Sequence, residues 1–230
     1  MVDVPDLPTQ LAAAARALQD ESGTQATLDR SVQLATELIP NCHYAGISIV
    51  HRDSTIDTTA ATDPLVVAGD ELQYKLGEGP CLDAISRHDT VSSANLVEEH
   101  RWPTWAPRLA AELNLASMLC LQLFTSSTVV GALNLYSTKV DAFDDNDIDT
   151  ATVLAAHIAV AVAETRQADQ LRLSAHSRNI VGQAQGILME RYQLDNTQAF
   201  LALRRVSQDN NIKLIHVAEN LVRTRTIPGL

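Results

Sequence analysis

The chain has 230 residues, a formal net charge of −11, and hydrophobic residues at 46% of its positions. A chain of this length holds one large domain or two modest ones, and its acidity argues against general electrostatic attraction of the whole molecule to nucleic acid or anionic membranes. The acidic N-terminus has no apolar core and no apolar run approaches the roughly 20 residues that span a bilayer, so we expect a reduced, soluble, cytoplasmic protein that does not enter a membrane.

The first part of the chain alternates between helical and β-rich patterns. Apolar residues three and four apart predict helix between Leu7 and Ile39, and Pro40 ends it. A β-branched run from His43 predicts a strand, with an antiparallel neighbour after the turn at residues 51–54. Further elements are expected to be helices at residues 63–76, 81–89 and 102–115, a short strand at 90–96, and a hairpin at 117–137 that turns at residues 126–127.

A run without proline follows Phe143 and predicts one long helix. Acids at its start suit a helix N-terminus, and the pattern could continue for up to roughly 45 residues, far beyond a typical globular helix. Its apolar positions fit a heptad only in part. We expect this helix to connect the two parts of the chain and to form the seam of a homodimer.

The charge changes sign along this connecting segment. After residue 174 there are seven Lys and Arg against four Asp and Glu, a net charge of +3, whereas the first 174 residues carry −14. Such a difference between two ends is typical of two parts with different functions.

Three apolar stripes in the basic part predict three short helices that pack together, since short helices are marginal alone. Asp195 or Asn196 is expected to cap the second helix, and Asn210 or Asn211 to start the third. The stripes are Ile180, Ala184, Ile187, Leu188 and Met189; then Ala199, Phe200, Leu203 and Val206; then Leu214, Ile215, Ala218, Leu221 and Val222.

The α+β part resembles the GAF family over roughly residues 27–163. The resemblance is carried by the loop LGEGPC at 76–81, the helix WPTWAPRLAAELNLAS, and the strand VVGALNLYS with the acid-capped helix after it. It implies an antiparallel sheet of about six strands flanked by helices, and a sensory site for a small-molecule ligand. The sequence identifies neither a ligand nor a cofactor.

The candidate sensory loop is Gly77, Glu78, Gly79 and Cys81. Its backbone N–H groups could hold a phosphate, but the loop lacks the Lys-Ser/Thr of a P-loop, and turning the chain is the favoured role. Cys81 could be a redox-sensing thiol, although a buried structural thiol is favoured. Cysteines and histidines do not cluster as a metal site requires, and no catalytic residue is expected.

The basic tail, RNIVGQAQGILMERYQLDNTQAFLALRRVSQDNNIKLIHVAENLV, resembles the ANTAR family. The resemblance implies RNA binding and transcription antitermination, in which a dimer grips two adjacent stem-loops of a nascent leader transcript. Gln185 stands where the family often has Lys, which removes one charge from the contact face. The RNA-binding candidates are Gln185, Gly186, Arg191, Arg204, Arg205, Asn210 and Lys213.

The chemistry of these residues suits contact with an RNA loop. Arg and Lys attract phosphate, Gln185 and Asn210 can hydrogen-bond base edges, and Gly186 permits close approach. For Gly186 and Ala184, tight helix packing is the favoured interpretation. The basic residues could equally form a solvated helix face.

The domains predicted from these patterns are an N-terminal helix at 1–26, a GAF-like sensory domain at 27–163, a connecting helix at 164–177, and an ANTAR-like domain at 178–225. Two alternatives stay open. Three short basic helices also suit a helix-turn-helix that binds DNA. A thiol-dependent methionine sulfoxide reductase is the other, although no second cysteine lies close to Cys81 in sequence to resolve a sulfenic acid.

Overall fold

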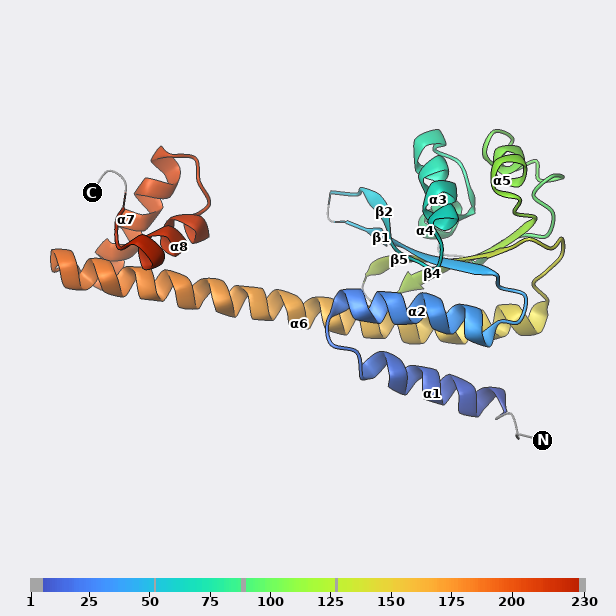
Figure 1. Cartoon of the computed structure of the whole chain (residues 1–230), viewed down its shortest axis with the longest axis horizontal. Helices are drawn as coiled ribbons and strands as arrows, with labels where there is room; N and C mark the ends of the chain where they lie inside the picture. Colours follow the sequence, from blue (N-terminus) through green and yellow to red (C-terminus); the bar gives the residue numbers. More distant parts are fainter. Residues whose placement is uncertain (1–5, 52, 88–89, 127, 228–230) are drawn as a thin grey trace. The chain divides into compact units, whose positions relative to one another are not determined.

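Figure 1 shows the computed structural model of the chain, which divides into two compact units, Met1–Gln167 and Ala168–Leu230. The long helix α6 (Asp145–Tyr192) begins in the first unit and ends in the second. Each unit has its own hydrophobic core. The structure describes residues 6–51, 53–87, 90–126 and 128–227.

The first unit is built on an antiparallel sheet. Within the described residues it has five strands in the order β2-β1-β5-β4-β3, so the expected sheet of about six strands is wrong by one. The strands are β1 (Tyr44–Val50), β2 (Ile56–Ala61), β3 (Thr90–Ser93), β4 (Ser117–Phe124) and β5 (Val129–Ser137).

Both hairpins predicted from the sequence are confirmed. Strand β1 pairs with β2, and β4 pairs with β5, each antiparallel. Parts of the expected turns and helix ends, namely Arg52, residues 88–89 and Ser127, lie outside the described residues.

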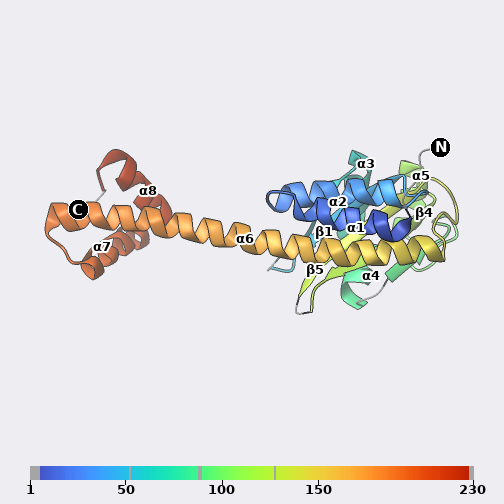
Figure 2. The same ribbon diagram turned by 90° about the horizontal axis from the view of Figure 1, so that it is seen from below.

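Helices cover both faces of the sheet (Figures 1 and 2). On one face lie α2 (Thr24–Leu38) and the first part of α6, with α1 (Leu7–Gln19) packed outside them. The other face is covered by α3 (Pro64–Leu76), α4 (Pro80–Arg87) and α5 (Trp105–Leu113).

Two cores result from the alternation of side chains along each strand. In β4, Leu119 and Leu121 face the core under α2 and α6, whereas Met118 and Cys120 face the core under α3, α4 and α5. Because both faces are buried, the strand reads as a continuous apolar run.

The helix expected between Leu7 and Ile39 is in fact two helices. α1 ends at Gln19 and α2 begins at Thr24. Gly23 before α2 has a φ of 99°, a conformation that glycine adopts without steric cost and that a continuous helix does not contain. The apolar spacing on both sides gave no sign of this break.

Helix α6 is as long as the proline-free run predicted, with 48 residues. By length and composition it could cross a membrane, because an 18-residue window in it has a mean hydropathy of 1.3. This is weak evidence for a membrane span, since the core helix of a soluble protein passes the same test, and α6 places Leu154, Ile158 and Val162 in the core of the first unit.

The second unit packs the end of α6 against α7 (Asn196–Asp209) and α8 (Leu214–Thr224), as the three stripes predicted. Asp195 caps α7 through a capping box with Gln198, which satisfies two backbone N–H groups at once. Within the described residues its buried core is Ala184, Leu188, Ala199, Leu203, Val206, Val217, Ala218, Leu221 and Ile227.

Three predictions for the second unit were wrong. Met189 and Phe200, which were predicted to be buried, have exposed fractions of 36% and 38%. Val217 of the third helix, which was not in its predicted stripe, is buried. Helix α8 starts at Leu214 after Lys213, rather than at Asn210 or Asn211. Asn210 instead ends α7, so the asparagines belong to the turn between the helices.

Candidate nucleic-acid interface and sensory core

The loop between α3 and α4 has the geometry of a turn. Gly77 ends α3 in the left-handed conformation with a φ of 69°, and Gly79 has a φ of 144°. A Cβ on Gly79 would collide with the Gln73 side chain, so only glycine fits there. Gln73 Oε1 in turn accepts a hydrogen bond of 2.9 Å from the Cys81 backbone N–H.

Glu78 points from this loop to the start of α5. Its carboxylate accepts hydrogen bonds from the backbone N–H groups of Thr104 and Trp105, at 2.7 and 2.6 Å. A carboxylate at a helix N-terminus satisfies free N–H groups and complements the helix dipole. The contact ties two distant segments together.

A buried carboxylate, Asp70 on α3, is the feature of the first unit that sequence reasoning missed. Asp70 is fully buried and accepts hydrogen bonds from Thr58 Oγ1 at 2.8 Å, Gln73 Nε2 at 3.2 Å, Asn134 Nδ2 at 3.1 Å, and the hydroxyl of Tyr136. Burial raises the pKa of Asp70 to about 6, against the lowering effect of these donors. Asp70 lies four residues after the buried Val66, on the same side of α3, and this helical spacing was the sequence signal that could have identified Asp70 as buried.

Two of the cysteines join this polar network. Cys81 Sγ lies 3.3 Å from Ser48 Oγ, which accepts from Asn134 Nδ2 at 2.9 Å. Asn134 Oδ1 accepts from Cys120 Sγ at 2.9 Å, so Asn134 and Ser48 connect the two thiols. The sequence argued against a reductase because no second cysteine lies close to Cys81 along the chain. In the folded protein Cys120 belongs to the same polar network, so that argument no longer applies.

Burial opposes reactivity of all three thiols. Cys42, Cys81 and Cys120 are free and exposed by 5% or less. Burial raises the pKa of Cys42 to about 12 and that of Cys120 well above its usual value, which suppresses the thiolate that reacts.

We expect iodoacetamide at pH 8 to modify the native protein at least about 100-fold more slowly than the urea-unfolded chain, because reaction requires the fold to open. Quenched samples analysed by mass spectrometry measure both rates. Rapid labelling of Cys81 or Cys120 in the native protein would contradict the structural role and favour the reductase alternative.

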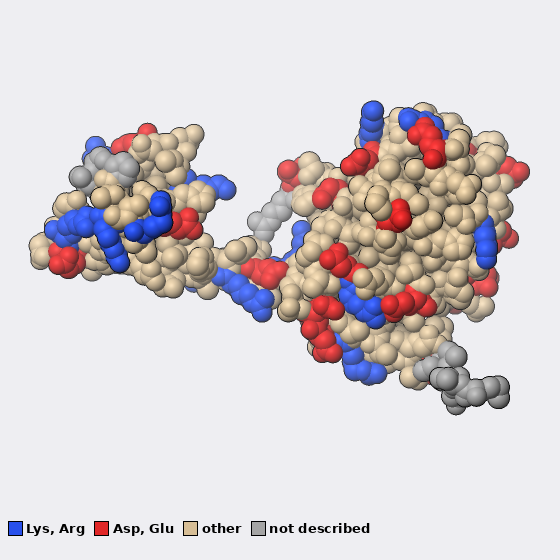
Figure 3. All heavy atoms as spheres, viewed as in Figure 1, with Lys and Arg blue, Asp and Glu red and all other residues tan. Residues whose placement is uncertain are grey.

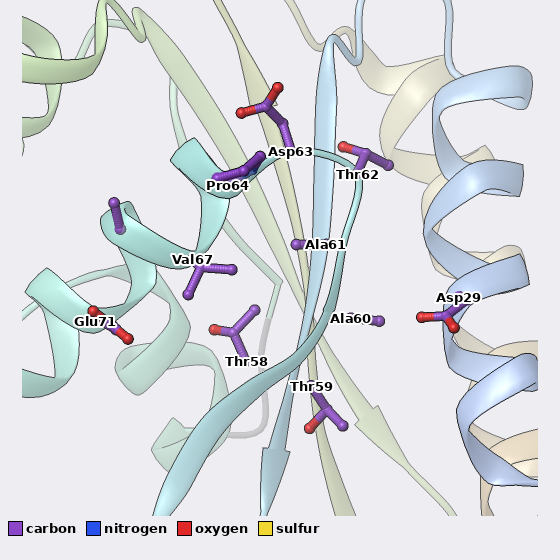
Figure 4. Close-up of a pocket in the computed structure, with 11 residues that line it drawn as sticks. Asp29, Thr58, Thr59, Ala60, Ala61, Thr62, Asp63, Pro64, Val67 and Glu71 are labelled. Atoms are coloured by element: carbon purple, nitrogen blue, oxygen red, sulfur yellow. The ribbon is translucent and has the colours of Figure 1, made fainter.

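A hollow of about 610 Å³ lies at the β2 edge of the sheet (Figure 4). Figure 4 shows Thr58 and Thr59 on β2, with Glu71 on α3 and Asp29 on α2 to either side. Asp63 also lines the hollow, so its charged groups are all acidic and suit a cationic or hydroxyl-rich molecule. No pattern in the sequence indicated this hollow, and the sensory role of the glycine loop stays a prediction.

Among the RNA-binding candidates, three side chains donate hydrogen bonds inside the second unit. Gln185 Nε2 donates to Asn196, at 2.7 Å to Oδ1 and 3.1 Å to the carbonyl. Arg191 Nη1 donates to the Arg225 carbonyl at 2.6 Å, at the C-terminal end of α8. Asn210 Nδ2 donates to the Val206 carbonyl at 2.9 Å. The Gln185 and Arg191 bonds connect α6 to the start of α7 and the end of α8, whereas the Asn210 bond stays within α7. All three bonds leave each group only partly available to RNA.

The other charged candidates face solvent. Arg204 and Lys213 are exposed, and their side chains have no hydrogen-bond or ion-pair partner among the residues that the structure describes. Arg205 is 84% exposed and lies 3.5 Å from Asp209, an exposed pair of little energetic value. Figure 3 shows Lys and Arg side chains over the second unit with few acids between them, whereas acids outnumber them on the visible face of the first.

The two small residues of α6 differ in their surroundings. Ala184 is fully buried, as close helix packing predicts. A Cβ on Gly186 would meet no neighbouring group within 4 Å in the described structure, so packing does not require glycine there. A glycine within a helix costs about 1 kcal/mol relative to alanine, and the packing interpretation of Gly186 is therefore wrong.

Within the described residues, no group of three or more His, Cys, Asp and Glu side chains could hold a metal ion.

Comparison with protein families finds two domains in the chain. Residues 21–163 match the GAF domain, and residues 169–222 match the ANTAR domain. The chain belongs to the GAF family and carries a C-terminal ANTAR domain. This GAF–ANTAR protein thus combines a sensory domain with a regulatory one, an arrangement typical of signal transduction and regulation. No curated protein matches it at a significant level.

Solved structures similar to the GAF–ANTAR protein share its GAF fold. The free methionine-R-sulfoxide reductase of Neisseria meningitidis in complex with its substrate is 19% identical, with a TM-score of 0.58 over 73% of this chain and 97% of that one. The GAF domain of a phosphoenolpyruvate-protein phosphotransferase from Acinetobacter is 14% identical, with a TM-score of 0.58 over 73% and 99%. At these identities the likeness shows the fold alone.

Proposed function

We propose that the GAF–ANTAR protein is a cytoplasmic, dimeric RNA-binding regulator that acts by antitermination at tandem stem-loops in nascent leader RNA, under control of its GAF domain. In this proposal residues 27–163 sense a small molecule, residues 164–177 connect, and residues 178–225 bind RNA. The protein then regulates without catalysis. Its antitermination is exerted by holding stem-loops that would otherwise rearrange into a terminator.

The observation that carries this proposal is the free basic surface of the ANTAR domain. The side chains of Arg204 and Lys213 are exposed and unpaired among the described residues, in the part of the chain after residue 174 that carries a net charge of +3. Unpaired bases in an apical loop are accessible, and guanidinium groups supply both phosphate attraction and stacking. The strong negative charge of the GAF domain opposes RNA binding elsewhere on the protein.

The dimer is supported by apolar residues left exposed on α6. Val153 and Val160 are exposed by 42% and 52% and lie seven residues apart, the spacing at which one side of a helix meets a partner helix. Two ANTAR domains held in one dimer would bind two adjacent stem-loops far more tightly than one, because the second contact becomes intramolecular. Sedimentation of the full chain with one or two stem-loops tests this stoichiometry.

The test of RNA binding uses the double variant Arg204→Ala/Lys213→Ala. We expect its affinity for a tandem stem-loop RNA to fall by about 10-fold or more at moderate salt, and the slope of log K against log salt to fall by about one for each phosphate contact removed. Fluorescence anisotropy with labelled RNA measures both quantities across a salt series.

Arg16→Ala is the matched control, since it removes an exposed charge from α1 of the acidic unit and should leave RNA binding unchanged. A duplex DNA of the same sequence separates the alternatives. Equal affinity for duplex DNA would favour the helix-turn-helix function, and no binding of wild-type protein to any stem-loop RNA would refute the proposal.

A further inference from the structure

A groove of about 530 Å³ lies on the surface of the ANTAR domain between the end of α6 and α8. Its volume falls within the roughly 300–1,000 Å³ of pockets that bind small ligands, so one nucleotide fits. It is separate from the exposed basic residues of α7. Its lining includes Gln183, Gly186, Ile187, Glu190, Arg191 and Arg225.

We propose that this groove holds one unpaired nucleobase of the stem-loop, in contact with the bare backbone of α6 at Gly186. The proposal rests on the proposed RNA-binding function and assigns it a base-binding site. The base would carry an exocyclic amino group, as adenine, cytosine and guanine do and uracil does not.

The glycine is the first support for this site. Gly186 lines the groove and is exposed, and in the described structure no side chain fills the space that its Cβ would take. The missing side chain lets a planar ring approach the helix, while Ile187 and Val222 on the groove wall supply apolar contact. Stacking of bases on such surfaces is the usual way in which proteins hold single-stranded nucleotides.

The charges of the groove give the second support, because they suit a base better than a phosphate. The carboxylate of Glu190 can accept a hydrogen bond from an amino group and would repel a phosphate at the same point. Arg191 Nη1 donates a hydrogen bond to the Arg225 carbonyl, which fixes its guanidinium at the end of α8, and Glu190 lines the same groove. The cationic side chains of Arg191 and Arg225 then remain for the sugar-phosphate backbone on either side of the base.

The chain offers a matched pair of variants to test this assignment. Gly182→Leu and Gly186→Leu add the same side chain to exposed glycines one helical turn apart on α6, and neither new Cβ meets a neighbour within 4 Å. Both replace glycine with a better helix former, so both proteins should fold at least as well as wild type. Only Gly186 lines the groove.

We expect Gly186→Leu to weaken binding of the full-length protein to RNA at least about 10-fold, and Gly182→Leu to change it less than about 2-fold. The probe is a tandem stem-loop RNA selected with wild-type protein from a pool whose loop nucleotides are randomised. Circular dichroism and thermal melting verify the folding of both variants. Wild-type affinity for Gly186→Leu, or equal losses in both variants, would overturn the groove as a base site.

A second measurement tests the choice of base. In the selected RNA, each loop nucleotide is changed to uracil in turn. One such change should weaken wild-type binding by about 10-fold and have less than about 3-fold effect on Glu190→Gln, whose neutral amide discriminates less. Equal loss in both proteins at every position would overturn the role of Glu190. Failure of the selection to yield any bound RNA would instead refute the proposed RNA-binding function.

Discussion

Replacing Asp70 with alanine is expected to lower the free energy of unfolding of the first unit by about 3–5 kcal/mol. The carboxylate is fully buried and accepts hydrogen bonds from Thr58, Gln73, Asn134 and Tyr136. Its removal leaves these donors in a dry site without an acceptor, together with a cavity. Urea unfolding followed by tryptophan fluorescence measures the loss, because both tryptophans of the chain are buried in this unit.

Asp70→Asn is the companion variant, since it keeps the shape and removes the charge. Burial raises the pKa of Asp70 from 3.8 to about 6 in the folded protein, so the folded state binds the proton more tightly than the unfolded chain. The stabilisation from Asp70 is therefore complete below about pH 4 and declines as the pH rises to about 6, by something of the order of 3 kcal/mol.

The difference between wild type and Asp70→Asn isolates this effect from other carboxylates. The pKa of Glu99, for example, is lowered to about 2 by hydrogen bonds from Arg101, and its contribution is lost in the opposite direction, as the pH falls. We expect the stability of wild type, relative to Asp70→Asn, to decrease between pH 4 and 6. If the free energy of unfolding of the two proteins changed in the same way with pH, burial would not raise the pKa of Asp70 and the prediction would be contradicted.

Local sequence patterns correctly predicted the helices and strands whose conformation depends on interactions between residues close in the chain. The proline-free run predicted α6, the turn-bounded apolar runs predicted both hairpins, and the capping residues Asp195 and Asn196 indicated the start of α7. In each case the determining interactions lie within a few residues in the chain. The charge reversal after residue 174 likewise indicated two parts of the chain, and it falls a few residues inside the matched ANTAR domain.

Contacts between distant segments could not be predicted in this way. Cys81 and Cys120 become neighbours only because β4 lies beside the start of α4 in the folded sheet, and the network around Asp70 draws on α3, β2 and β5. The exposure of Phe200 depends on how α6 and α8 cross α7, which helical spacing alone does not determine. Arg191 was predicted to face RNA with a free side chain. It instead donates a hydrogen bond to the Arg225 carbonyl, a contact between two helices that local spacing does not reveal.

The last prediction concerns the small core of the ANTAR domain. Leu203 is fully buried among a few apolar residues from three helices, and replacing a buried leucine with alanine costs about 2–5 kcal/mol. That loss is comparable with the whole stability of a unit of this size, and its short helices do not persist alone. We therefore expect Leu203→Ala to unfold the second unit, lose helical ellipticity and bind stem-loop RNA at least about 100-fold more weakly.

The first unit should stay folded in this variant, because its two cores share no residue with that of the second. Tryptophan fluorescence then reports an unchanged urea midpoint while circular dichroism reports an earlier, separate transition. Leu201→Ala is the matched control, since Leu201 lies on the same helix and is 51% exposed. A single shared transition, or full RNA affinity in Leu203→Ala, would show that the two units do not unfold independently or that the bundle does not form the RNA-binding surface.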